Sequence, residues 1–140
     1  MGSKLVDTAY RSQCLLEGTV QANRWDCNYL WANGGRPIKC FYHNDADGKC
    51  AGFWVHYSAR IAPNNETIDF IEMSYEKPFP MDTIQPNEQI YIVDYSITPY
   101  EMLQLLKITQ DVTWIDHHKT AIERYKDFGR DIRGIRYDGI

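Results

Sequence analysis

Residues 38–48 read Ile38-Lys39-Cys40-Phe41-Tyr42-His43-Asn44-Asp45-Ala46-Asp47-Gly48, an apolar run that passes directly into an acidic turn. Residues 38–42 are typical of a buried strand, and a helix is predicted at about 48–61. Apolar residues recur in this helix at i, i+3, i+4, i+7 and i+11, which predicts a single apolar face. That face would consist of Cys50, Phe53, Trp54, Tyr57 and Ile61.

The rest of the chain repeats this alternation of strand and helix. Further strands are predicted at residues 67–73, 89–94 and 112–115, and a proline-rich irregular connection precedes the second of these. Strands that alternate with helices indicate βαβ units. We therefore predict an α/β fold with a doubly wound, mostly parallel sheet of about four strands and flanking helices.

Two predicted helices begin with a capping box, in which a threonine is followed three residues later by a glutamate. One box is Thr98-Pro99-Tyr100-Glu101 and the other is Thr120-Ala121-Ile122-Glu123. Gly129 is expected to end the second helix. The buried stripe of the first helix is predicted to be Met102, Leu103 and Leu106.

Length and composition fit one soluble domain. The chain has 140 residues, 44% of them hydrophobic and 24% charged. Residues 37–140 form the predicted domain, whereas residues 1–36 look like an N-terminal extension, native or vector-derived, with no assigned chemistry. No apolar run approaches the roughly 20 residues of a membrane helix, and no secretory signal is recognisable, so a cytoplasmic location is expected.

Charge and cysteine content restrict the function further. The net charge of −4 disfavours a protein that follows long nucleic acids, and favours a small phosphate substrate with metal ions supplying positive charge. The four cysteines form no Cys-x-x-Cys pair and are expected to be reduced and mostly packed, although a two-disulfide secreted fold is the alternative. They are Cys14, Cys27, Cys40 and Cys50.

Acidic and imidazole side chains follow three of the predicted strands. These are Asp45 and Asp47 after the first, Asp94 at the end of the third, and Asp116, His117 and His118 after the fourth. Because ligands bind beyond the carboxyl ends of strands in such sheets, the three sets should converge. Adjacent carboxylates repel unless cations neutralise them, so the cluster implies metal. The plainer interpretation is a set of solvated loop carboxylates with incidental histidines.

The ligand types favour particular metals. Carboxylates with one or two imidazoles suit Mn²⁺, with Fe²⁺, Co²⁺ or Zn²⁺ as alternatives, while a pure oxygen set would favour Mg²⁺. Asp45 and Asp47 could address two different ions, and Asp94 is placed to bridge them. Two ions at about 3.5–4 Å could clamp a phosphoryl group during in-line attack.

Three motifs in this order resemble the DHH phosphoesterase family. They are His43-Asn44-Asp45-Ala46-Asp47-Gly48, Ile92-Val93-Asp94 and Trp114-Ile115-Asp116-His117-His118, which together lie between residues 37 and about 122. The resemblance implies hydrolysis of phosphodiesters or phosphoanhydrides with two metals, usually manganese.

The resemblance also implies individual roles. His43 and Asp45 would hold one metal, Asp47 and His117 the other, and Asp94 both. His118 would contact the substrate phosphate, which Lys119 could assist, and Asp94, His117 and His118 would be the catalytic residues. Asp116 is expected to accept a hydrogen bond from the imidazole of His117 and so to fix the orientation of that ring. For His43 and Lys119 the alternatives are a packed histidine and a solvated lysine.

The sequence departs from the family pattern at its C-terminal end. The family has a further metal-binding aspartate downstream and a separate C-terminal substrate domain, whereas the nearest candidates here are Asp131 and Asp138. The chain is therefore expected to be a truncated domain with weakened metal binding and turnover. Arg130, Arg133 and Arg136 could form an anion-binding edge, although a solvated segment is favoured, and His56 is expected to face solvent.

The leading functional hypothesis is a manganese-dependent phosphodiesterase for short oligonucleotides (nano-RNA) or cyclic dinucleotides. A RecJ-like single-strand exonuclease is an alternative, which the lack of a basic groove disfavours. A pyrophosphatase is disfavoured by the short spacing between His43 and Asp45. An alternative of another class is a fragment that binds metal or nucleotide without turnover. A homodimer is left open, and no membrane partner is expected.

Overall fold

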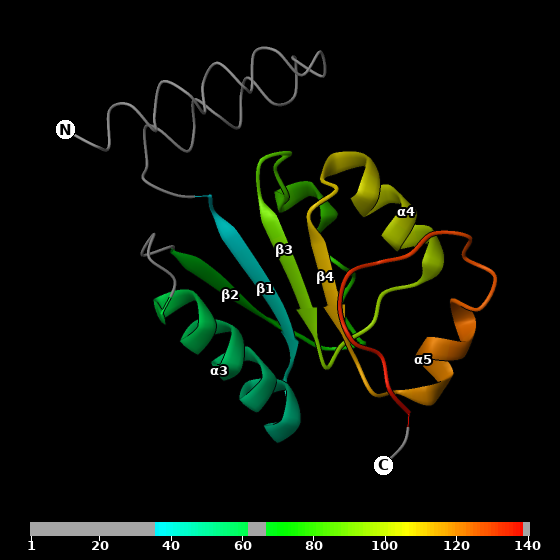
Figure 1. Cartoon of the computed structure of the whole chain (residues 1–140), viewed down its shortest axis with the longest axis horizontal. Coiled ribbons are helices and arrows are strands. Elements are labelled where there is room, and N and C mark those ends of the chain that lie inside the picture. Colours follow the sequence, from blue (N-terminus) through cyan, green and yellow to red (C-terminus); the bar gives the residue numbers. More distant parts are fainter. Residues whose placement is uncertain (1–35, 62–66, 139–140) are drawn as a thin grey trace.

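The computed structural model describes residues 36–61 and 67–138, which form alternating strands and helices (Figure 1). The predictions for residues 1–35, including those for Cys14 and Cys27, lie outside the described residues. The elements in chain order are β1 (Ile38–His43), α3 (Ala46–Ile61), β2 (Ile68–Met73), the 3-10 turn η1 (Met81–Thr83), β3 (Gln89–Val93), α4 (Pro99–Ile108), β4 (Val112–Ile115) and α5 (Lys119–Arg124).

The four strands form one sheet in the order β2-β1-β3-β4, and every neighbouring pair is parallel. The predicted α/β fold with a four-stranded parallel sheet is therefore confirmed. Strand order reverses between β1 and β3, because the chain moves outward to β2 and then returns past β1. Such a reversal places a crevice at the carboxyl ends of β1 and β3. In Figure 1 this end of the sheet lies low in the view, where α3 and α5 begin.

The two sheet faces carry different cores. On one face, Cys40 of β1 and Val93 of β3 pack with Val55 of α3. On the other face, a larger cluster joins β1, β3 and β4 to α4 and α5, and its fully buried members include Phe41, Ile90, Ile92, Met102, Leu105 and Trp114. Successive strand residues point to opposite faces, so β1 and β3 each supply both cores.

The predicted apolar face of α3 is wrong. Phe53, Trp54 and Tyr57 are 58%, 60% and 50% exposed, and Ile61 and Cys50 also lie in solvent. The buried face consists instead of Gly48, Gly52, Val55 and Ala59. Small residues let the helix approach the sheet closely, and this leaves the aromatic residues on the outer side. The expectation of mostly packed thiols holds for Cys40, which is buried, and fails for Cys50.

The observed orientation of α3 predicts how substitutions on its two sides affect stability. Phe53→Ser should change the free energy of unfolding by about 0.5 kcal/mol or less, since exposed positions tolerate substitution. Val55→Ser removes a buried apolar side chain and leaves a hydroxyl in the core, so it should cost about 2 kcal/mol or more. Urea unfolding of both variants measures the difference. Equal losses, or a larger loss for Phe53→Ser, would contradict the described helix orientation.

The first predicted capping box is confirmed and the second is wrong. Thr98 caps α4, with the hydroxyl accepting from the Glu101 amide and the Glu101 carboxylate accepting from the Thr98 amide. Helix α5 instead starts at Lys119, with His118 at its N-cap and no side-chain cap, and it ends at Arg124, before Gly129. In α4, Met102 and Leu106 are buried as predicted. The third buried residue is Leu105 and not the predicted Leu103, which is 40% exposed.

A further extended segment lies beside β4 (Figure 1). The Trp114 amide donates to the Arg133 carbonyl at 2.8 Å, and the Asp116 amide donates to the Ile135 carbonyl at 3.1 Å. The two bridges are parallel, so residues 133–136 continue the sheet past β4. None of the described helices is long and apolar enough to span a membrane.

Candidate metal centre

The three predicted sets of side chains meet at one end of the sheet. His43 is the last residue of β1, Asp94 follows β3 directly, and Asp116 follows β4. Two groups of metal-ligating atoms result, each with its atoms within 4.8 Å of one another. One group is His43, Asp45 and Asp94, and the other is Asp94, His117 and His118. Asp94 belongs to both groups, which is the arrangement expected of a bridging carboxylate.

Asp94 has an unusual backbone and an unsatisfied carboxylate. Its φ is +50°, the only positive φ among the described non-glycine residues. The residue is 6% exposed, and Oδ1 lies 2.8 Å from Nε2 of His117. Oδ2 is buried without a hydrogen-bond partner in the described part of the chain. Left-handed conformations and unpaired buried oxygens are both costly, and such features concentrate at functional sites.

Asp45 and His43 form the side of the site nearest β1 and α3. Nδ1 of His43 lies 2.8 Å from Oδ2 of Asp45, and the Gly48 amide donates to Oδ1 of Asp45 at 2.8 Å. The Gly48 hydrogen bond, followed by that of His43, lowers the pKa of Asp45 to about 2. Burial raises the pKa of Asp94, and the neighbouring Asp45 carboxylate raises it further. A cation between these carboxylates would relieve that repulsion.

Asp116 orients the second imidazole of the motif. Its Oδ1 lies 2.6 Å from Nδ1 of His118 and accepts from the backbone amides of His117 and His118 at 2.8 and 3.3 Å. The expectation that Asp116 fixes the imidazole of His117 is therefore wrong, because that ring contacts Asp94 instead. Oδ2 of Asp116 is buried and without a partner among the described residues.

The hydrogen bond from the His118 imidazole to Asp116 raises the pKa of His118, and burial opposes this only in part. Because the folded-state pKa lies above the ordinary value of about 6.5, protonated His118 stabilises the metal-free fold below that pH. This stabilisation is lost as pH rises through the folded-state pKa. In chelator-treated protein, His118→Gln should therefore lower the free energy of unfolding more at about pH 5.5 than at about pH 8.5. Urea titrations at both pH values test this, and an equal loss at both would contradict it.

Asp47 and Lys119 lie at the edge of the site. Asp47 is exposed and belongs to neither group, but it lines a cavity of about 430 Å³ together with Asp94, Asp116 and His117. Lys119 is exposed as the first residue of α5. The other residues that line this cavity are mostly apolar, namely Ala51, Ile115, Ile135 and Tyr137.

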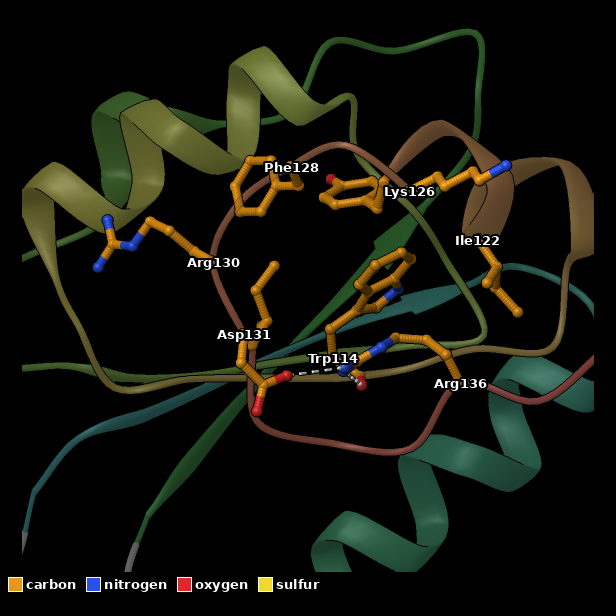
Figure 2. A pocket seen from close by; sticks show the side chains of 9 residues that line it. Trp114, Ile122, Lys126, Phe128, Arg130, Asp131 and Arg136 are labelled. Atoms are coloured by element: carbon orange, nitrogen blue, oxygen red, sulfur yellow. Dashed lines mark hydrogen bonds and ion pairs between the residues drawn. The ribbon is translucent and has the colours of Figure 1, made fainter.

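The downstream candidates do not join the two groups. The side chain of Asp131 is 98% exposed and pairs with Arg136 at 3.6 Å, and Asp138 is also exposed. Arg133 pairs with Asp111. Arg136 and Arg130 line a second cavity of about 290 Å³, seen in Figure 2 with Trp114 and Phe128. Because Arg136 also donates to the Trp114 carbonyl at 3.2 Å, it holds the C-terminal segment against β4.

Two aromatic residues beside His43 were not predicted from the sequence. The rings of Tyr75 and Tyr95 stack on each other and lie near the imidazole of His43. Tyr95 follows Asp94 directly, so a position near the metal-ligating side chains could have been predicted from the second motif. Tyr75 comes from the loop after β2 and carried no local signal. His56, expected in solvent, is partly buried with its ring edge-on to Phe70.

The chain matches no protein-family model, and no curated protein matches it.

Proposed function

We propose that this chain is a divalent-metal-dependent phosphodiesterase of the DHH type, acting on short oligonucleotides or cyclic dinucleotides. The observation that carries the proposal is Asp94, a buried carboxylate shared by two groups of potential ligands on the carboxyl ends of the strands. Its unpartnered Oδ2 supports the same interpretation, because a buried carboxylate oxygen requires a cation or a donor.

The residues fit two transition-metal ions better than magnesium. His43, Asp45 and Asp94 would hold one ion, and Asp94 with His117 the other. Two imidazoles among the carboxylates favour Mn²⁺, with Fe²⁺, Co²⁺ or Zn²⁺ as alternatives. Such ions would supply the positive charge that stabilises a phosphoryl group under attack and the acidity that activates water.

The protein's own groups would then position the substrate. Nδ1 of His118 lies 4.0 Å from Oδ1 of Asp94, and the hydrogen bond to Asp116 raises the pKa of His118, which favours its protonated form. An imidazolium there would donate to a phosphate oxygen. The adjoining cavity of about 430 Å³ has room for part of a dinucleotide, and its apolar lining residues suit the ribose or one of the two bases more than a free phosphate.

The proposal is tested with purified protein, Mn²⁺ and a dinucleotide. Release of mononucleotide that chelation stops and added Mn²⁺ restores is the expected result. Asp82→Asn serves as a control for charge change, because Asp82 lies in η1 outside both ligand groups. Binding of Mn²⁺ and nucleotide without product would instead favour a non-catalytic binding module. If calorimetry detects no Mn²⁺ binding, the metal centre itself is wrong.

A further inference from the structure

Three aromatic rings meet at the carboxyl ends of β1, β2 and β3. His43 ends β1, Tyr75 lies two residues after β2, and Tyr95 lies two residues after β3. The rings of Tyr75 and Tyr95 are stacked, with centroids 4.8 Å apart and planes at 21°. The Tyr75 ring also lies 5.3 Å from the His43 imidazole. Stacked aromatic pairs of this separation are attractive, so the Tyr75 ring has a defined position.

The two tyrosines differ sharply in exposure. Tyr95 is 4% exposed and belongs to the main core, whereas Tyr75 is 57% exposed. Tyr75 therefore rests on a rigid, buried ring while most of its own surface meets solvent. This arrangement presents a flat aromatic surface that needs no ordering on binding, and pre-organisation of this kind favours ligand affinity.

The exposed ring lies next to the candidate metal centre. The His43 ring contacts both Tyr75 and Asp45, and Tyr95 is the residue after Asp94 in the chain. A phosphate bound to a cation at His43, Asp45 and Asp94 would therefore be separated from Tyr75 by the His43 ring. In a nucleotide, the base is separated from the phosphate by one ribose, which matches an aromatic surface that lies beside a candidate cation site.

We propose that Tyr75 is the nucleobase platform of this site, on which a base of the substrate stacks while its phosphate lies at Asp94. The inference rests on the proposed function and names its substrate class, a nucleotide with an exposed base. Stacking accepts any base because each has a π-face, so little sequence preference is expected. The phenolic hydroxyl is not required, since the ring face makes the contact.

Equilibrium binding tests the platform without requiring turnover. In the presence of Mn²⁺, the protein should bind adenosine monophosphate about tenfold or more tightly than ribose 5-phosphate, since loss of one base–aromatic stack has about this effect. Tyr75→Ala should remove that preference by weakening only the adenosine monophosphate complex. Tyr75→Phe should retain it. Tyr100→Ala, which removes an exposed tyrosine on α4, is the matched control and should change neither affinity.

The outcomes separate the platform from the proposed hydrolysis. A preference for the base that disappears in Tyr75→Ala supports the platform whether or not a dinucleotide is cleaved. The platform would be overturned if Tyr75→Ala weakened binding of adenosine monophosphate and ribose 5-phosphate equally, or left the preference for adenosine monophosphate unchanged. Either result would count even if the wild type cleaves a dinucleotide. Failure of the wild type to bind either ligand would also overturn it. If hydrolysis occurs, Tyr75→Ala should raise KM for a dinucleotide and leave KM for its abasic analogue unchanged.

Discussion

Asp94→Asn should reduce Mn²⁺-dependent release of mononucleotide by about 10³-fold or more. Removal of a single transition-state donor already costs about 10²–10³ in rate, and Asp94 is shared by both ligand groups. Asparagine keeps the shape of the side chain but carries no charge and ligates metal weakly. Turnover of a dinucleotide by the variant and the wild type at saturating Mn²⁺ measures the loss.

The fold should survive this substitution. Asparagine tolerates a positive φ better than most residues, so the backbone at +50° is accommodated. Burial and Asp45 raise the pKa of Asp94, so its ionised form destabilises the metal-free fold once the pH exceeds that pKa. The metal-free variant should therefore be as stable as the wild type, or more stable, at neutral pH.

Added Mn²⁺ provides the complementary readout. It should raise the Tm of the wild type, since a ligand that binds only the folded state stabilises it, and this increase should be lost in Asp94→Asn. Asp82→Asn should keep both the Tm increase and the activity. Wild-type activity in Asp94→Asn would refute the bridging role, and a variant that unfolds without metal would show that Asp94 is structural instead.

Gly48→Ala should destabilise the protein by about 3 kcal/mol or more. A Cβ atom at Gly48 would lie 2.0 Å from the backbone carbonyl oxygen of His43, which cannot move without displacing the end of β1. The Gly48 amide also donates to Asp45, so the shift would disturb the His43–Asp45 contact at the candidate metal centre. Urea unfolding and Mn²⁺ titration of the variant measure the two effects.

Gly52→Ala is the matched control for this substitution. Gly52 lies one helical turn further along the same buried face of α3, but the atoms nearest to its added Cβ would be those of the Tyr42 side chain at 3.5 Å or more, an ordinary contact. Alanine is favoured over glycine in a helix by about 1 kcal/mol, so Gly52→Ala should be neutral or stabilising. Similar losses in both variants would contradict the close approach of α3 to the end of β1.

The parallel sheet was predictable because its strands are short apolar runs bounded by polar or breaking residues. The end of each strand could be located to within a residue, and so the polar side chains that follow β1, β3 and β4 could be placed at one edge. The capping box at Thr98 was equally local, since all of its partners lie within four residues.

The missed features depend on tertiary contacts. The inner face of α3 is formed by Gly48, Gly52, Val55 and Ala59, and a pattern based on large apolar residues selects the opposite side. The partner of Asp116 depends on the backbone turn after β4, which brings Nδ1 of His118 to its carboxylate. Tyr75 reaches His43 only because β1 and β2 are paired so that His43 lies opposite Met73.

The most direct test is a crystal of the protein soaked in Mn²⁺, with the ions located by their anomalous scattering. The account predicts two ions about 3.5–4 Å apart, both in contact with the carboxylate of Asp94, one next to His43 and Asp45 and the other next to His117. Crystals without bound ions, or with ions held by other carboxylates and Asp94 left unligated, would contradict it.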